Sequence, residues 1–315
     1  DMQACVGTQV AAATLPVDLF ALVDGSASMP EATASGVSKW YATKAAFRDF
    51  LEHAPTGMGF GLSLFPTPGD DAASCSAGSY RDAALPIADV SEMASGALKR
   101  LDAVTPQRQT PTAPAFMAAL DVASAHALKH PERSVVVVLA TDGLPTTCTP
   151  TDVPALAELA KAALDGPAHV RTLVVTSNAL SGPGNSGFER VAVAGGTQRA
   201  LVVDPRGDFS GQLTNALSVA ATRQVACDLA LPEPPRGQHL DYDAVNVVLD
   251  GSKRVTLPRV AGSASCDARG GWYYDVDPAV GAPSRLNMCR ASCDRAAALG
   301  TSSLEVELGC KTLVR

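Results

Sequence analysis

The 315-residue sequence carries a net charge of −7, and 46% of its residues are apolar while only 18% are charged. This composition excludes a disordered chain, and the acidic balance argues against nucleic acid as a partner while it suits cations and basic protein surfaces. No stretch is long and apolar enough to span a bilayer, and the length suggests about two domains.

The first 225 residues alternate between strand-like and helix-like patterns. Val17–Val23 is a continuous apolar run, typical of a strand buried on both faces. Residues 134–140 (SVVVVLA) hold four β-branched residues in succession, which favours a central parallel strand. Repeated βα units predict an α/β fold with a doubly wound, mainly parallel sheet covered by helices on both faces. Strands are expected at 17–23, 57–65, 83–90 (an edge strand, because of Pro86), 134–140, 170–175 and 200–203, and helices at 40–51, 92–104, 112–129, 153–164, 188–194 and 209–225.

The pattern changes at Cys227. A proline-rich segment, 231–237 (LPEPPRG), precedes several short strand patterns and one short helix. A domain of this size has a limited core, which disulfides worth about 2–4 kcal/mol each would supplement. We therefore predict a first domain over 1–226 and a small, disulfide-stapled, β-rich C-terminal module over 227–315. The strands of this module are expected at 245–249, 254–260, 271–276 and 304–310, and its helix at 291–299.

The eight cysteines indicate an oxidising compartment. Their number is even, they are spread along the chain, and no CxxC pair occurs, so disulfides explain them better than a zinc ribbon does. Because the numbering starts at Asp1 rather than at Met, we expect that a signal peptide precedes it, with a lipid-anchor segment upstream as a further option. The protein is therefore expected outside the cytoplasm, as a secreted, periplasmic or cell-surface protein.

Oxygen-bearing side chains gather where predicted strands end. One carboxylate and two serines follow the first strand, a second aspartate follows the strand at 134–140, and a threonine precedes the helix at 112–129. In open α/β sheets, ligands bind at this edge. Donors that are all oxygen suit Mg²⁺, with Mn²⁺ or Ca²⁺ as alternatives, and do not suit zinc or copper. The predicted metal ligands are Asp24, Ser26, Ser28, Thr110 and Asp142.

Three segments carry a family resemblance. DGSASM (24–29) resembles the D-x-S-x-S element of von Willebrand factor A-type (VWA) domains, TPTAP (110–114) their threonine loop, and ATDG (140–143) their second aspartate loop. The resemblance covers about residues 14–225. It implies a Rossmann-like fold with a metal-ion-dependent adhesion site (MIDAS), in which the five predicted ligands hold a divalent cation and a partner protein donates a carboxylate to it.

Two positions depart from the family pattern. Ala27 stands where the family usually has glycine, and Arg108-Gln109 stands where the threonine loop often begins with Gly-Gly. Neither change removes a ligand. The C-terminal part is similar to the tail of bacterial secreted or lipid-anchored proteins that carry a VWA domain, which adds to the expectation of an extracytoplasmic location.

The favoured function is a protein-binding or adhesion module rather than an enzyme. None of the five histidines lies near a predicted strand end, so no nucleophile–base pair is evident. The alternatives are a Mg²⁺-dependent phosphoryl-transfer or hydrolase-type enzyme and a passive structural protein of the envelope. The enzyme would need a lysine or arginine beside the metal, and only Arg108 is adjacent in sequence.

The cysteines suggest two disulfide pairs. Cys75 and Cys148 lie in loops on the rim that carries Asp142, so we expect a bond between them. The ends of this kind of domain are often neighbours, which suggests Cys5–Cys227. The other four allow three pairings: Cys266, Cys289, Cys293 and Cys310.

Three further patterns have plain structural interpretations. His126 and His130 are spaced like metal ligands but enclose no glutamate, so we interpret them as a solvated helix end. Alternation along 271–276 predicts that Trp272 and Tyr274 are buried and that Tyr273 is exposed. The glycine-rich segment 181–187 lacks the spacing of a phosphate-binding loop and is interpreted as a surface loop.

Overall fold

The chain divides into two compact units. Pro16–Thr222 forms one, called the sheet domain here, and Asp1–Leu15 together with Arg223–Arg315 forms the other, called the small module. The structure is a computed structural model, and it describes residues 8–11, 15–67, 69–177, 187–197, 199–223, 228–232, 239–250, 253–299 and 304–315.

The sheet domain is built on a six-stranded sheet with the order β4-β3-β2-β5-β6-β7. Strand β4 at the edge runs antiparallel to β3, and the other neighbours are parallel. This is the doubly wound, mainly parallel sheet that the sequence predicts. Its strands are β2 (Val17–Asp24), β3 (Gly59–Phe65), β4 (Leu85–Asp89), β5 (Ser134–Thr141), β6 (Arg171–Thr176) and β7 (Leu201–Val202).

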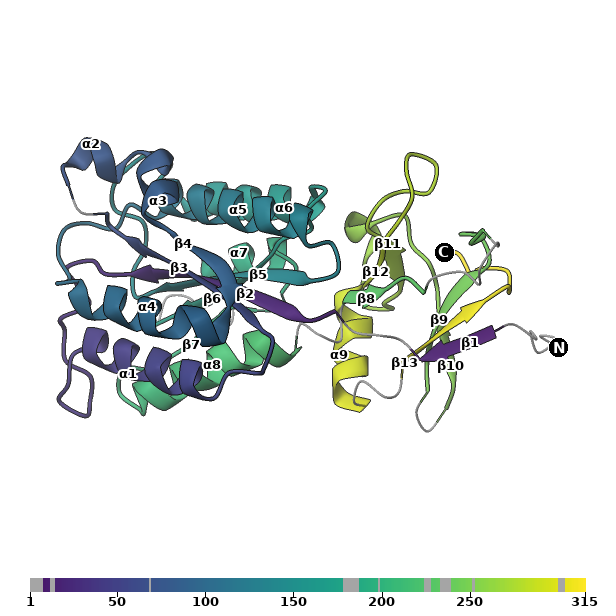
Figure 1. The fold of residues 1–315 in the computed structure, drawn as a ribbon, viewed down its shortest axis with the longest axis horizontal. Helices are drawn as coiled ribbons and strands as arrows, with labels where there is room; N and C mark the ends of the chain where they lie inside the picture. The colour runs from purple at the N-terminus through teal and green to yellow at the C-terminus, as the bar shows by residue number, and fades with distance from the viewer. Residues whose placement is uncertain are drawn as a thin grey trace. The chain divides into compact units, whose positions relative to one another are not determined.

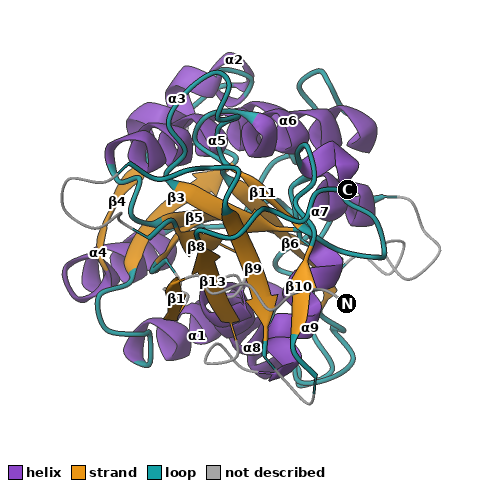
Figure 2. Ribbon diagram, turned by 90° about the vertical axis from the view of Figure 1, so that its right-hand side faces the viewer, coloured by secondary structure: helices purple, strands orange, loops and turns teal. Residues whose placement is uncertain are grey.

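Helices cover both faces of this sheet (Figure 1). One face carries α1 (Lys39–Glu52), α4 (Val90–Ala103) and α8 (Phe209–Arg223). The other carries α2 (Asp71–Ser74), α3 (Ala77–Ala83), α5 (Thr112–Lys129), α6 (Val153–Asp165) and α7 (Phe188–Ala194). Figure 2 shows α3, α5 and α6 on one side of the strands and α1 and α8 on the other. None of the helices in the described ranges combines the length and the apolar character needed to cross a membrane.

The core is densest around β2 and β5, in which every residue is buried. Phe20 packs with Phe116 in a cluster that joins the sheet to α5, α6 and α7, and on the other face Phe47 of α1 packs edge-on against Phe60. The register places Val23 opposite Ala140. Because β2 and β5 are parallel neighbours, the loops that follow them begin at the same edge of the sheet.

The small module has two antiparallel sheets, with the orders β1-β13-β9-β10 and β11-β12-β8. They share a core in which Trp272 is fully buried, and a disulfide joins Cys266 to Cys289. Cys293 and Cys310 are also disulfide-bonded. The elements are β1 (Thr8–Ala11), β8 (Asp228–Ala230), β9 (Val245–Leu249), β10 (Val255–Leu257), β11 (Trp272–Tyr274), β12 (Arg285–Met288), α9 (Arg290–Leu299) and β13 (Leu304–Leu308).

Two details of the small module differ from the sequence-based expectation. Strand β1 pairs with β13, with Thr8 opposite Leu308, so the first residues group with the small module and not with the domain expected at 1–226. The prediction that Tyr273 is exposed is wrong. Its exposed fraction is 7%, because Val260 and Cys289 cover the face of β11 on which it lies.

Candidate metal site

The first loop of the candidate site starts where β2 ends. Asp24 is the last residue of β2 and is fully buried. Its Oδ1 accepts a hydrogen bond from the backbone N–H of Ser26 at 2.8 Å, and the hydroxyls of Ser26 and Ser28 lie 3.1 Å apart. The turn thus places one carboxylate and two hydroxyls next to one another, at alternate residues of one short loop.

The loop after β5 meets this first loop. Ser28 Oγ donates to Asp142 Oδ1 at 2.7 Å, and Thr141 Oγ1 donates to Asp24 Oδ2 at 2.6 Å. These two hydrogen bonds connect residues that are more than a hundred positions apart in sequence. They follow from the pairing of β2 with β5, which starts both loops at one edge of the sheet.

The threonine loop is attached to both of the others through its backbone. Ala27 N–H donates to Arg108 O at 2.9 Å, and Thr110 N–H donates to Thr146 Oγ1 at 2.9 Å. Arg108 has a φ of 69°, a conformation that favours glycine, so this loop is tied down at some conformational cost. Within the described ranges, the Thr110 hydroxyl makes no hydrogen bond with the other four predicted ligands.

Asp24 is a buried carboxylate without a cationic partner among the described residues. Burial is the main cause that raises its pKa, to about 6, and the nearby charge of Asp142 adds to the effect. The hydrogen bonds from Thr141 and Ser26 act in the opposite direction but do not restore the ordinary value. A cation placed between Asp24 and Asp142 would relieve both the desolvation and the repulsion.

The structure also brings a lysine to the site. Lys39, the first residue of α1, donates from Nζ to Asp142 Oδ2 at 2.9 Å and to Glu31 Oε2 at 2.6 Å. Burial opposes the charged form, but the bonds to Glu31 and Asp142 outweigh it and raise the pKa of Lys39. Sequence reasoning missed this residue. The signal that could have found it is its place at the start of a predicted helix. A cation in the first turn of a helix is unfavourable unless carboxylates hold it.

The donor set fits a hard divalent cation. Apart from the ammonium of Lys39, which cannot bind a cation, the converging side chains offer carboxylate and hydroxyl oxygens. This is the chemistry of Mg²⁺ and Mn²⁺ sites and, with more ligands, of Ca²⁺ sites. In the described part of the chain, no group of three or more His, Cys, Asp or Glu side chains is arranged to hold a metal. A zinc-type centre therefore has no support among these residues.

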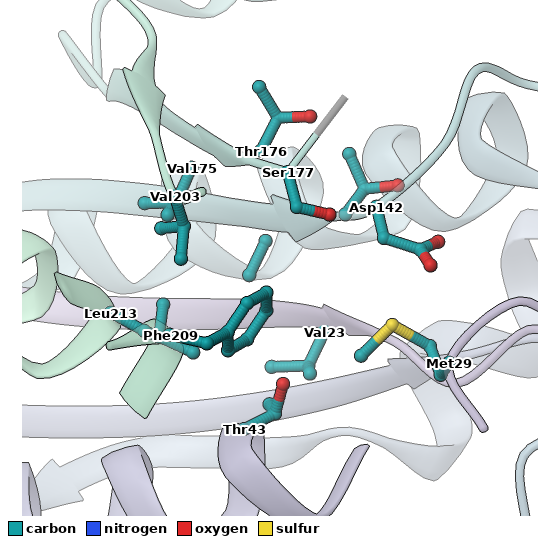
Figure 3. Close-up of a pocket in the computed structure, with 12 residues that line it drawn as sticks. Val23, Met29, Thr43, Asp142, Val175, Thr176, Ser177, Val203, Phe209 and Leu213 are labelled. Atoms are coloured by element: carbon teal, nitrogen blue, oxygen red, sulfur yellow. The ribbon is translucent and has the colours of Figure 1, made fainter. Parts of the chain in front are cut away.

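A narrow pocket of about 20 Å³ lies beside Asp142. Figure 3 shows Asp142 and Ser177 towards one end of it and Phe209, Val203 and Leu213 towards the other. Ser177 Oγ is buried and has no hydrogen-bond partner among the residues that the structure describes. The volume suffices for about one water molecule, so this pocket is too small to hold an organic ligand.

A disulfide braces the rim of the site. Cys148, six residues after Asp142, is bonded to Cys75 at the end of α2. This is the pair expected from the sequence. The bond fixes the far end of the segment that also holds Thr146, and Thr146 is hydrogen-bonded to Thr110. The expected pair Cys5–Cys227 lies outside the described residues.

A second group of charges lies at the opposite end of β2. Asp18 is buried and accepts hydrogen bonds from Arg133 Nη2 at 2.6 Å and from the backbone N–H of Gly59 at 2.7 Å. His126 Nε2 lies 2.7 Å from Asp18 Oδ2. The expectation of a solvated helix end is therefore wrong for His126, which is held by this buried carboxylate, whereas the side chain of His130 is 44% exposed. The glycine-rich segment 181–187 lies, apart from Gly187, outside the described residues.

No family model and no curated protein matches the chain. Among solved structures it is similar to a von Willebrand factor type A protein from Catenulispora acidiphila, with 16% identity, a TM-score of 0.46, and coverage of 95% of this chain and 59% of that one. It is also similar to BatB from Bacteroides thetaiotaomicron, with 18% identity, a TM-score of 0.44, and coverage of 65% of this chain and 98% of that one. A third similar structure is the manganese-loaded TRAP protein of Plasmodium vivax, with 16% identity, a TM-score of 0.36, and coverage of 74% of this chain and 93% of that one. At TM-scores of this size, the fold assignment rests on the sheet order and helix layers described above.

Proposed function

We propose that the sheet domain is a VWA-type protein-binding module that grips its partner through a divalent cation of the MIDAS type. Asp24, Ser26, Ser28, Thr110 and Asp142 would hold the cation, with Mg²⁺ expected first and Mn²⁺ or Ca²⁺ as alternatives. When bound, the cation supplies an electrophilic position that accepts a carboxylate oxygen from a partner protein.

One observation carries this proposal. Ser28 Oγ bonds both Ser26 Oγ and Asp142 Oδ1, next to a buried Asp24 that has no cationic partner in the described ranges. A purely structural loop would satisfy a buried carboxylate with a lysine or arginine, as the same strand does at Asp18 with Arg133. The contrast between the two ends of β2 supports a binding role for the Asp24 end.

The cysteines support a location outside the cytoplasm. Each of the cysteines in the described residues is disulfide-bonded, and disulfides persist in oxidising compartments. We therefore place the module in the envelope or the extracellular space, where a surface or secreted protein would be its partner.

Metal titration tests the proposal. Isothermal titration of the metal-free protein with Mg²⁺ or Mn²⁺ should give one site, and Asp24→Ala and Ser28→Ala should each weaken it at least about tenfold. Ser91→Ala is the matched control, because Ser91 is an exposed serine bonded to Asp89 away from the site. Wild-type protein that binds neither ion at millimolar concentration would contradict the proposal.

A partner test follows from the same variants. A protein captured from an envelope extract in Mg²⁺ should be released by EDTA, and it should not be captured by Asp24→Ala. Capture that survives both EDTA and Asp24→Ala would show that binding uses another surface.

A Mg²⁺-dependent phosphoryl-transfer enzyme is the second candidate, and Lys39 is the observation that favours it. Such enzymes place a cation near the metal, and Lys39 lies at this position beside Asp142. Both acceptors of Lys39, however, are carboxylates of this chain. Hydrolysis of p-nitrophenyl phosphate that needs Mg²⁺ and is lost in Asp24→Ala would reverse the ranking.

A further inference from the structure

Lys39 is in an unusual place for a lysine. It occupies the first position of α1, where the helix dipole disfavours a cation, and its side chain is only 10% exposed. It is held by one buried and one exposed carboxylate, since the Asp142 side chain is 2% exposed and that of Glu31 is 65% exposed. Its ammonium therefore lies at the inner edge of the candidate site, and Glu31 covers it from the solvent side.

The two oxygens of Asp142 have different partners. Oδ1 accepts from Ser28 and thus faces the predicted cation ligands, whereas Oδ2 accepts from Lys39. One carboxylate is therefore shared between the ligand group and a fixed positive charge of the protein. A divalent cation that approaches Asp142 meets the repulsion of that ammonium at close range, where water screens it poorly.

We propose that Lys39 is a built-in counter-ion of the metal site that lowers its affinity for divalent cations, and that Glu31 sets how firmly Lys39 holds Asp142. This inference rests on the proposed metal site. In the metal-free protein the ammonium stabilises Asp142. When a cation binds to Asp142, Lys39 can keep its ion pair with Glu31.

The proposal makes opposite predictions for the two residues. Lys39→Met keeps the apolar stem of the side chain and removes the charge, so the Kd for Mn²⁺ should fall about tenfold or more. Glu31→Gln removes the outer carboxylate and leaves Lys39 to Asp142 alone, so the Kd should rise about threefold or more. A lysine that only positions Asp142 would give weaker metal binding in Lys39→Met.

Two matched controls exclude a general charge effect. Lys44 lies on the same helix and pairs with Asp102 at 3.2 Å, so Lys44→Met removes one positive charge of α1 away from the site. Glu52→Gln removes one negative charge at the other end of α1. Both controls should bind Mn²⁺ as the wild type does.

The experiment is a Mn²⁺ titration of the full chain and these four variants, by calorimetry and by electron paramagnetic resonance of free Mn²⁺, with circular dichroism to check folding. Tighter binding in Lys39→Met together with weaker binding in Glu31→Gln supports the proposal. Unchanged or weaker binding in Lys39→Met overturns it. If Lys39→Met does not fold, unchanged or tighter binding in Glu31→Gln overturns it.

The same titration distinguishes failure of the metal site from failure of the role proposed for Lys39. If the wild type binds Mn²⁺ and Lys39→Met binds equally well, the role of Lys39 fails and the metal site stands. If neither the wild type nor either variant binds, the metal site itself fails and the role of Lys39 fails with it.

Discussion

The hydroxyl of Thr141 donates to Asp24 Oδ2 at 2.6 Å and so connects the last residues of β5 and β2. The same hydroxyl accepts a hydrogen bond from the backbone N–H of Gly143 at 3.3 Å. One buried threonine therefore fixes both the central carboxylate of the candidate site and the turn that presents Asp142.

Replacing Thr141 tests this connection. Thr141→Val leaves Asp24 buried with one donor fewer, so the free energy of unfolding of the metal-free protein should fall by about 1–3 kcal/mol at pH 7. Urea denaturation followed by circular dichroism measures it. Thr172→Val is the control, since Thr172 Oγ1 is buried on β6 and has no hydrogen-bond partner in the described part of the chain. Loss of this hydroxyl should be neutral or stabilising. Equal losses in both variants would mean that the Thr141–Asp24 bond contributes nothing specific.

The two buried carboxylates of β2 should give opposite pH dependences. The pKa of Asp24 rises from 3.8 to about 6 in the folded protein, so the folded state binds this proton more tightly than the unfolded chain does. Its contribution to stability therefore falls as pH rises from about 4 to about 6 and is constant above that range. In EDTA, Asp24→Asn should be more stable than wild type by about 3 kcal/mol at pH 7 and equal to it below about pH 4.

Asp18 provides the matched control for this pH dependence. Burial acts to raise its pKa, but the bonds from Arg133 and His126 outweigh burial and lower it. Its contribution is therefore present above its ordinary pKa and is lost as pH falls. Asp18→Asn should destabilise the protein at pH 7, and the difference should shrink in acid. Urea denaturation of both variants between pH 3 and 8 checks this, and parallel curves for the two would contradict the assignment.

Arg108 carries a strain that glycine would relieve. Its φ of 69° lies in the region that disfavours side chains, and its carbonyl accepts from Ala27 in that conformation. Arg108→Gly should increase the free energy of unfolding by about 0.5–1 kcal/mol and so raise the midpoint of thermal unfolding. Gln109→Gly, next to it but without a positive φ, should lower the midpoint. A lower midpoint for Arg108→Gly would show that contacts of the arginine side chain outweigh the strain.

The Cys75–Cys148 disulfide should support cation binding as well as folding. The double variant Cys75→Ser, Cys148→Ser should lose about 2–5 kcal/mol of stability and should bind Mn²⁺ more weakly, because the loop with Asp142 and Thr146 loses its anchor. Cys266→Ser with Cys289→Ser removes the disulfide of the small module and should leave Mn²⁺ binding unchanged. Equal effects of both pairs on the Kd would exclude a local role for the first.

The sequence predicted the sheet domain well because its signals are local. Apolar runs such as Val17–Val23 and 134–140 predict buried strands by themselves, and side chains that follow parallel neighbours must meet at one edge. Lys39 could not be found in this way. Its contact with Asp142 spans 103 positions and depends on the direction in which α1 starts.

The small module shows the same limit. Strand β1 has only four residues, and its partner β13 begins at Leu304, so no local pattern predicts the pairing. Tyr273 was misplaced because simple alternation assumes that one face of a strand meets solvent, whereas Val260 and Cys289 close that face.

The β1–β13 pair has a mechanical consequence. Because residues 8–11 and 304–308 are adjacent strands of one sheet, the sheet domain is an insertion between two segments of the small module. Because Thr8 and Leu308 lie opposite each other in this antiparallel pair, tension that pulled these two residues apart would open its hydrogen bonds one after another. The sheet domain would stay unstretched until the pair had opened.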